Sequence, residues 1–256
     1  AAQVGHSALR YYAMGEDAYQ REATDDEIKT MATALREGLS AGAVGFSTSQ
    51  SATQVGAYGE PVPSRFSSYD EIRQLCNVLT EFSGGIIAVN PNPGAGYVNP
   101  EFQELLTSLS VETGRPVLWN SLMHRRDRPD GWREMLDFMD RAEAKQARVY
   151  AIARCQRLDI QFDLHHTVML DRLPAWKEII DLPYEDKRKL FANEHTRAML
   201  KIDWDQPDHG PGMLADTVRV DRTRLAQNKN AEGALISDLA AKNNQHAVDY
   251  LLDLAL

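Results

Sequence analysis

The most constraining feature of the sequence is a pattern of helix, glycine and short strand that recurs along the chain. Apolar runs that read as strands begin near residues 43, 86, 117 and 149, and a helical pattern separates each run from the next. This spacing is about one βα unit, which predicts parallel strands joined by helical crossovers. The runs are continuously apolar, as expected for a sheet that is covered by other elements. We therefore predict an α/β fold with parallel strands.

The ends of the predicted helices support the same pattern. Thr24-Asp25-Asp26-Glu27 and Ser68-Tyr69-Asp70-Glu71 both match a capping box, in which the first and last side chains satisfy backbone N–H groups. Asn99-Pro100 places proline at the first position of a third helix. Gly42 and Gly114 follow helical patterns and can adopt the left-handed turn that closes a helix.

Composition limits the classes of partner. The net charge of −9 argues against nucleic acid and anionic membrane surfaces, because both repel an acidic protein. No apolar run approaches the roughly 20 residues of a transmembrane helix. The two cysteines, Cys76 and Cys155, form no metal knuckle or disulfide framework and suit a reducing compartment, so we expect a cytoplasmic protein. The chain begins without methionine and ends in an apolar helical run, so we expect a fragment of a longer polypeptide.

Several stretches together resemble the amidohydrolase superfamily, and within it the branch of D-aminoacylases and N-acyl-D-amino-acid deacylases. They are VGHSALR (4–10) with AMG (13–15), GAVGFST (42–48), GEPVPSR (59–65), and GALISDLA (233–240) with AVDYLLDL (247–254). The resemblance implies a partial or complete TIM-like (β/α) barrel with parallel strands and a helical insertion. It also implies zinc, a metal-bound hydroxide that attacks an amide carbonyl, and a small-molecule N-acyl amino acid as substrate.

The βα pattern and its interruption predict a division of the chain into three parts. Residues 1–170 would be βα units of the barrel, 171–212 a helical insertion or lid, and 213–256 a C-terminal strand and helices. The segment 171–205 is charged and aromatic, and it either covers the barrel mouth or packs on a neighbouring subunit. An incomplete barrel exposes strand edges and apolar helix faces, so a homo-oligomer is possible.

The metal ligands of the family are missing from two positions. The fifth-strand histidine should fall near Val89-Asn90 and the sixth-strand histidine near Asn120-Ser121, but neither segment contains an imidazole. Asparagine and serine are poor zinc ligands. Either the enzyme holds its metal differently or this branch has lost it. The alternative to an amidohydrolase is therefore a degenerate barrel that serves as a binding or assembly subunit.

We select seven candidate substrate-binding residues. Ser47, Thr48 and Asn120 are polar side chains at predicted strand ends, where ligands lie in wound α/β folds. The resemblance puts His6 near the active-site mouth, with a substrate contact and a structural polar role both open.

The three remaining candidates are in loops. Arg65 belongs to a long loop and is either a carboxylate anchor or part of a structural salt bridge. His124 and Arg125 begin a basic loop that either binds a substrate carboxylate or is a solvated charged loop. His165-His166 is interpreted as a loop pair, because adjacent side chains rarely share one ion.

Overall fold

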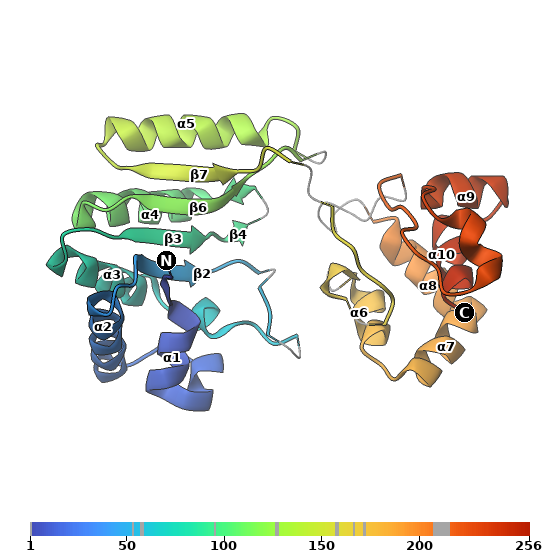
Figure 1. Cartoon of the computed structure of the whole chain (residues 1–256), viewed down its shortest axis with the longest axis horizontal. Helices are drawn as coiled ribbons and strands as arrows, with labels where there is room; N and C mark the ends of the chain where they lie inside the picture. Colours follow the sequence, from blue (N-terminus) through green and yellow to red (C-terminus); the bar gives the residue numbers. More distant parts are fainter. Residues whose placement is uncertain are drawn as a thin grey trace. The chain divides into compact units, whose positions relative to one another are not determined.

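The chain forms two compact units, Ala1–Arg157 and Leu158–Leu256. The computed structural model describes residues 2–52, 54–56, 59–94, 96–125, 128–156, 159–165, 167–170, 173–206 and 216–256. Figure 1 shows the sheet and its helices in the first unit and the helices of the second. Each unit has its own hydrophobic cluster, so each is described by itself.

The first unit is built on a five-stranded sheet in which all neighbouring strands are parallel. Its strands lie in the order β1, β2, β3, β6, β7. They span Val4–Gly5, Gly45–Ser49, Ile86–Asn90, Val117–Leu122 and Val149–Ala153. A short antiparallel pair, β4 (Pro93–Gly94) and β5 (Tyr97–Val98), follows β3. The predicted parallel α/β fold is confirmed.

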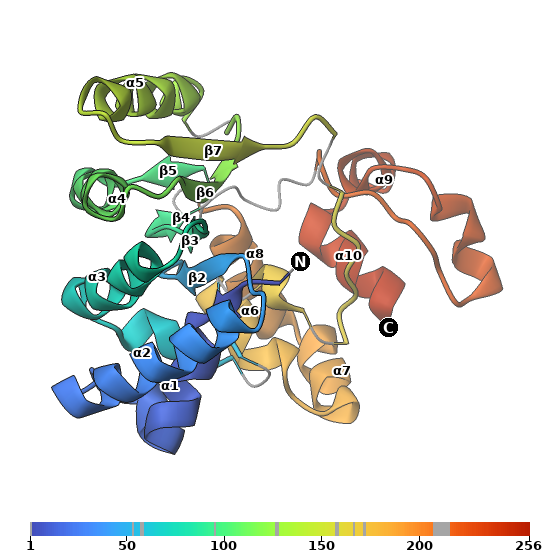
Figure 2. The same cartoon turned by 60° about the vertical axis from the view of Figure 1, so that its left-hand side comes forward.

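The helices of this unit lie on one side of the sheet. They are α1 (His6–Met14), α2 (Asp25–Ser40), α3 (Tyr69–Asn77), α4 (Pro100–Thr113) and α5 (Gly131–Ala144), with 3₁₀ turns η1 (Gly15–Tyr19), η2 (Pro63–Phe66) and η3 (Val78–Glu81). Figure 2 shows α2, α3, α4 and α5 along the same face. Parallel crossovers are right-handed, so a sheet whose strands are added in chain order carries all its helices on one face. This is the arrangement of a partial (β/α) barrel.

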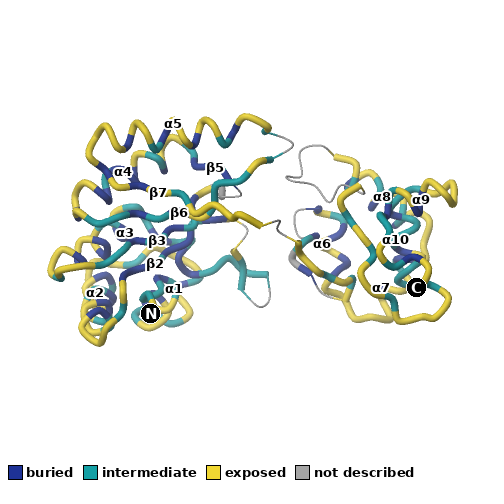
Figure 3. Tube along the Cα trace, turned by 45° about the horizontal axis from the view of Figure 1, so that its top comes forward, coloured by how far each residue is buried: buried dark blue, intermediate teal, exposed yellow. Residues whose placement is uncertain are grey.

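The strand register assigns side chains to the two faces of the sheet. Residues paired across parallel strands point to the same side, and successive residues point to opposite sides. The rows that face the helices are Phe46, Ile87, Val117 and Val149, then Thr48, Val89, Trp119 and Ala151. Their apolar members belong to the main core or pack against it. In Figure 3 the helices α2 and α5 carry buried and exposed segments in alternation along the helix, as expected for helices that pack one face against a sheet.

The helix ends agree with their sequence signals, with one exception. Thr24 and Glu27 form a complete capping box at α2. Asn99 caps α4, and Gly114 closes it in the left-handed conformation with φ of 63°. At α3, Ser68 accepts the backbone N–H of Glu71. The carboxylate of Glu71 does not complete the box, because it bonds to other side chains.

Strand β2 differs from its expected position. The sequence predicted a strand that starts near residue 43 and ends at the hydroxyl cluster, whereas the strand runs from Gly45 to Ser49 and contains these hydroxyls. Pairing with β3 explains the shift, because Thr48 and Ser49 lie opposite Val89 and Asn90. Gly45 has φ of 154°, and a Cβ added at this position would overlap the carbonyl oxygen of Ile86. The strand therefore begins at a position where only glycine fits.

The second unit is helical. It contains η4 (Val168–Leu170), α6 (Pro174–Ile180), α7 (Tyr184–Ala192), α8 (Glu194–Trp204), η5 (Ala226–Ala231), α9 (Ile236–Lys242) and α10 (Ala247–Ala255). Trp176, Phe191 and Leu200 share one buried cluster with Val248 and Leu252. The division at Arg157 comes before the predicted boundary at residue 170, and α10 packs with α6 and α8. In place of the C-terminal strand predicted within 213–256, the described residues there contain an isolated bridge between Arg219 and Leu235.

Within the described part of the chain, every helix is too short or too polar to cross a membrane.

Candidate functional site

Polar side chains form a row at the carboxyl edge of the parallel sheet. Ser49 of β2 lies opposite Asn90 of β3. Asn120 follows Trp119, the last residue of β6 that pairs with β3, just as Asn90 follows its partner Val89. The register therefore places Ser49, Asn90 and Asn120 on the face opposite the helices. Asn120 is exposed and Asn90 is half-buried.

The same face becomes apolar one row earlier. Ser47 is half-buried and shares its row with Ala88, Leu118 and Tyr150. Tyr150 and Ile152 of β7 are 51% and 44% exposed. The face thus combines apolar surface with amide and hydroxyl groups at its carboxyl edge. This is the composition of a site for a partly apolar ligand that carries a few hydrogen-bonding groups.

A hydrogen-bond network fixes the loop that follows β2. The Ser64 hydroxyl donates to the carbonyl of Ser49 at 2.8 Å, and the Ser7 hydroxyl donates to the Ser64 hydroxyl at 3.0 Å. The amide of Gln50 donates to the Ser67 hydroxyl at 2.8 Å and also contacts the carbonyl of Ser64. These contacts hold the η2 turn against the end of the strand.

A buried polar cluster lies on the helix side of β2. His6 Nδ1 is 2.8 Å from Thr48 Oγ1, and His6 Nε2 is 2.8 Å from Glu71 Oε1. Arg10 Nη1 donates to both Glu71 oxygens at 2.6 and 2.5 Å, and Arg10 Nη2 donates to the carbonyl of Arg21. His6, Arg10 and Glu71 are at most 1% exposed. The cluster joins α1, β2 and α3.

The hydrogen-bond partners define the ionisation of this cluster. Burial lowers the pKa of His6 by more than the hydrogen bond to Glu71 raises it, so the pKa lies below its ordinary value of 6.5. Burial raises the pKa of Glu71, but the hydrogen bonds and charges of His6 and Arg10 lower it by more. At neutral pH the imidazole is neutral and Glu71 is ionised. Because a carboxylate can only accept, we assign the imidazole proton to Nε2, and Nδ1 accepts from Thr48.

The order carboxylate, imidazole, hydroxyl is the one that activates hydroxyl nucleophiles in acyl transfer. Here Thr48 is 6% exposed and its hydroxyl is held by a buried imidazole. Arg10 neutralises the carboxylate, and the lowered pKa of His6 makes the imidazole a weak base. These features favour a structural role for the cluster over activation of a nucleophile. They also place Thr48 in the protein interior.

The loop candidates have more open surroundings. Arg65 is half-buried in η2, and its guanidinium donates a hydrogen bond to the carbonyl of Gln54, at 3.4 Å. Other arginines of the unit, such as Arg21 and Arg36, are paired with carboxylates. His124 is exposed and Arg125 half-buried, a few residues beyond the end of β6. Of the pair His165-His166, His165 is exposed and His166 lies outside the described residues.

Two members of the buried cluster, Arg10 and Glu71, were missed by the sequence analysis. Glu71 was assigned to a capping box, and its position at the third residue of a helix hid its second partner. His6 and Arg10 are four residues apart and therefore share one face of α1. Both also share this face with the apolar Leu9. A histidine and an arginine on an apolar helix face predict burial, and buried polar groups need a polar partner.

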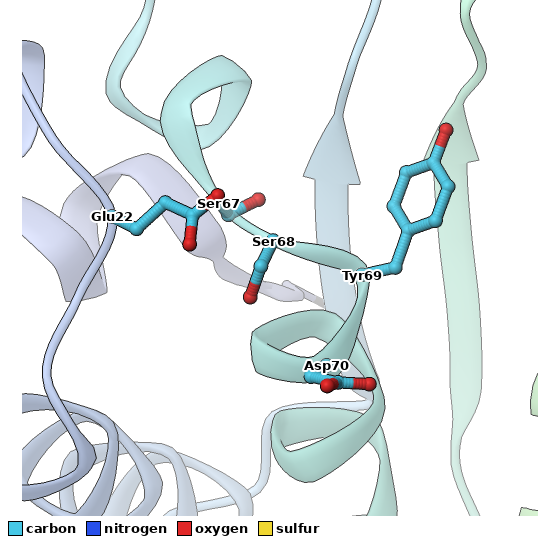
Figure 4. A pocket seen from close by; sticks show the side chains of 5 residues that line it. All are labelled: Glu22, Ser67, Ser68, Tyr69 and Asp70. Atoms are coloured by element: carbon cyan, nitrogen blue, oxygen red, sulfur yellow. The ribbon is translucent and has the colours of Figure 1, made fainter.

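A surface pocket of about 360 Å³ lies at the start of α3, apart from these candidates. It is lined by Glu22, Ser67, Ser68, Tyr69 and Asp70. In Figure 4 the Glu22 side chain points toward the two serines, whereas the Tyr69 ring points away from them. The pocket has two carboxylates and contains none of the predicted substrate-binding residues.

The donor set at the strand ends does not fit zinc. Zinc takes imidazole, thiolate or carboxylate ligands, whereas this row offers Ser49, Asn90 and Asn120. Among the described residues, no three His, Cys, Asp or Glu side chains form a group that could hold a metal ion. The disagreement noted from the sequence therefore persists in the structure.

Fold and site together define an α/β protein whose singly wound parallel sheet has a polar carboxyl edge. Neither a protein-family model nor a curated protein sequence matches the chain. Among solved structures, a D-aminoacylase is similar with 19% identity and a TM-score of 0.49, over 98% of this chain and 41% of that chain. An N-acyl-D-glutamate deacylase from Bordetella bronchiseptica, complexed with zinc and a phosphonate inhibitor, is similar with 18% identity and a TM-score of 0.49.

The latter match covers 100% of this chain and 42% of the deacylase. A D-aminoacylase mutant in complex with copper chloride shows 21% identity and a TM-score of 0.48, over 98% of this chain and 41% of that chain. These are proteins of the branch that the sequence motifs resemble, and the chain spans less than half of their length. Because the TM-scores are below 0.5 and the identities below 25%, the likeness does not establish a shared activity.

Proposed function

We propose that the chain forms part of an amidohydrolase that cleaves the amide bond of N-acyl amino acids, with preference for the D configuration. The observation that carries this proposal is the polar carboxyl edge of the sheet face opposite the helices, formed by the exposed Asn120, the half-buried Asn90 and the buried Ser49. Amide and hydroxyl groups suit the hydrogen bonds of an acylated amide, and the apolar row beneath them suits its acyl chain. The motif resemblance supports the choice of reaction.

The substrate carboxylate needs a cation. Arg65 is the best candidate, because its guanidinium has no carboxylate partner among the described residues and lies in a turn that Ser64 ties to the end of β2. Arginine binds carboxylates through two parallel hydrogen bonds. His124 and Arg125 are the second candidate pair, and Ser47 and Asn120 would orient the amide.

A second candidate function is favoured by one observation. Asn90 and Asn120 stand where the resemblance expects zinc-binding histidines, and the described residues offer no replacement set. A barrel of the same descent that binds an N-acyl amino acid without hydrolysing it would have this composition. The described residues hold no group of His, Cys, Asp and Glu side chains that could bind a metal and activate water, so in either case these 256 residues alone should show weak or no turnover.

Metal analysis and activity separate the two functions. The longest natural chain containing these residues is purified, its zinc content is measured, and release of free amino acid from N-acetyl-D- and N-acetyl-L-amino acids is followed. Stoichiometric metal and turnover of the D series support the hydrolase. A metal-free protein that binds these compounds without turnover supports the binding subunit, and a protein that neither binds nor cleaves them contradicts both.

Arg65→Ala tests the carboxylate site. Loss of a charge-assisted hydrogen bond should raise KM, or the dissociation constant of the binding subunit, by about ten- to a hundredfold. Arg73→Ala is the matched control, because Arg73 lies on α3 in a surface pair with Asp70 at 3.3 Å. An unchanged affinity in Arg65→Ala would remove this residue from the site and leave the His124 and Arg125 loop.

A further inference from the structure

The buried cluster lies directly behind the strand end that forms the proposed site. Thr48 lies between Ser47 and Ser49 in β2, and its side chain points toward the helices while theirs point to the opposite face of the sheet. A hydrogen bond that anchors the Thr48 side chain restrains the backbone at this residue, and the same backbone carries Ser47 and Ser49. His6 provides that bond at 2.8 Å.

His6 can fix Thr48 only if the imidazole itself cannot rotate. Glu71 holds Nε2 of His6 at 2.8 Å, and Arg10 holds both oxygens of Glu71. His6 also begins α1 immediately after Gly5, which pairs with Ser47 across β1 and β2. The chain of contacts from Arg10 through Glu71 and His6 to Thr48 thus ends on the strand that presents the site.

We propose that Glu71 is a positioning residue, which acts through His6 and Thr48 to set the geometry of Ser47 and Ser49 at the carboxyl end of β2. A carboxylate at this position fixes the imidazole with its proton on Nε2, so that Nδ1 receives the Thr48 hydroxyl. Without it, β2 would keep its backbone pairing with β3 but lose the side-chain anchor at its end. The consequence for substrate rests on the proposed function, whereas the consequence for β2 does not.

Hydrogen exchange measures the anchor directly. In Glu71→Gln, amide protection should fall in the whole unit by the loss of global stability, and β6, residues 117–122, reports that loss alone. Protection in residues 45–51 should fall by about ten- to a hundredfold more than in β6, the equivalent of one lost hydrogen bond to a charged group. A purely structural role would lower protection in both strands through global unfolding. An equal loss in both strands, or no loss in 45–51, overturns the proposal.

Two further variants complete the experiment. Thr48→Val has nearly the same shape and removes only the hydroxyl, so it should reproduce the local loss even where Glu71→Gln does not fold. Glu81→Gln is the matched control, because Glu81 accepts two hydrogen bonds of 2.7 Å from Arg36 on the surface, and its exchange should equal that of the native chain. Loss of protection in 45–51 in this control would contradict the proposal.

Activity gives a separate result. If the full-length protein cleaves N-acetyl-D-amino acids, Thr48→Val should raise KM and leave kcat within about twofold, as expected when only ground-state binding is affected. If KM is unchanged while protection in residues 45–51 is lost, the hydrogen bond of Thr48 does not affect substrate binding. That result would overturn the proposed effect of Glu71 on the substrate site. A native protein without any turnover would contradict the proposed hydrolase, while the exchange result would still decide the role of Glu71.

Discussion

At the scale of single residues, the buried ionic cluster has a large effect on stability. Glu71 and Arg10 are fully buried and make two hydrogen bonds to each other. A buried charge is tolerated only when a partner of opposite charge and its hydrogen bonds offset the lost hydration. The residues of this cluster therefore depend on one another.

Removal of Glu71 should be strongly destabilising. Glu71→Ala leaves the Arg10 guanidinium buried without a counter-charge, and we expect the free energy of unfolding to fall by about 3–5 kcal/mol. Urea unfolding followed by circular dichroism measures this change. Glu81→Ala, which breaks an exposed pair with Arg36, should have little effect. A small effect in Glu71→Ala would show that Arg10 finds another partner.

The same cluster predicts a stability that falls on acidification. The pKa of His6 is lowered in the folded state, so below about pH 6.5 the unfolded chain binds a proton that the folded chain does not. The pKa of Glu71 is also lowered, and the unfolded carboxyl takes up a proton near its ordinary pKa of 4.5 before the folded one does. The free energy of unfolding should therefore fall first below pH 6.5 and again below pH 4.5.

Urea unfolding at successive pH values follows both losses. His6→Gln should remove the part of the pH dependence near pH 6.5 and retain the part near pH 4.5. A native profile that is flat between pH 7 and 5 would contradict the assignment of a neutral His6.

At the scale of secondary-structure elements, the junction of β2 and β3 is the most sensitive point of the sheet. Gly45 lies opposite Ile86 with no room for a side chain. Gly45→Ala should cost several kcal/mol or prevent folding, because a new Cβ must displace the backbone of β3. Gly84 has open space around it, so Gly84→Ala should have a small effect. Thermal unfolding of both variants makes the comparison, and equal effects would mean that the strands pair differently.

At the scale of the whole molecule, the chain has two separate cores. Trp119 belongs to the cluster of the first unit and Trp176 to that of the second. Two independent cores predict unfolding in two steps rather than one. Hydrogen exchange at increasing urea should show residues 86–90 and 174–180 losing protection at different concentrations. A single coincident transition would show that the units unfold as one.

Local sequence signals determined much of the fold. The capping box at Thr24, the proline after Asn99 and the glycine at 114 act within a few residues, and the structure contains all three helix ends. The recurrence of helix and strand was enough to predict parallel strands, because strands separated by helical crossovers of this length run in the same direction. The polar residues at Asn90 and Asn120 were also visible from the strand ends.

Only the tertiary structure decided where β2 ends and which polar groups lie in the interior. The sequence predicted that the strand ends at the hydroxyls of Ser47, Thr48 and Ser49. In the structure these three residues pair with β3 and are part of the strand. Glu71 satisfies a local rule for a capping box, yet its carboxylate bonds to Arg10 and His6, which precede it by more than 60 residues. The physical reason is distance along the chain. Caps and turns depend on neighbouring residues, whereas burial and charge pairing depend on residues that only folding brings together.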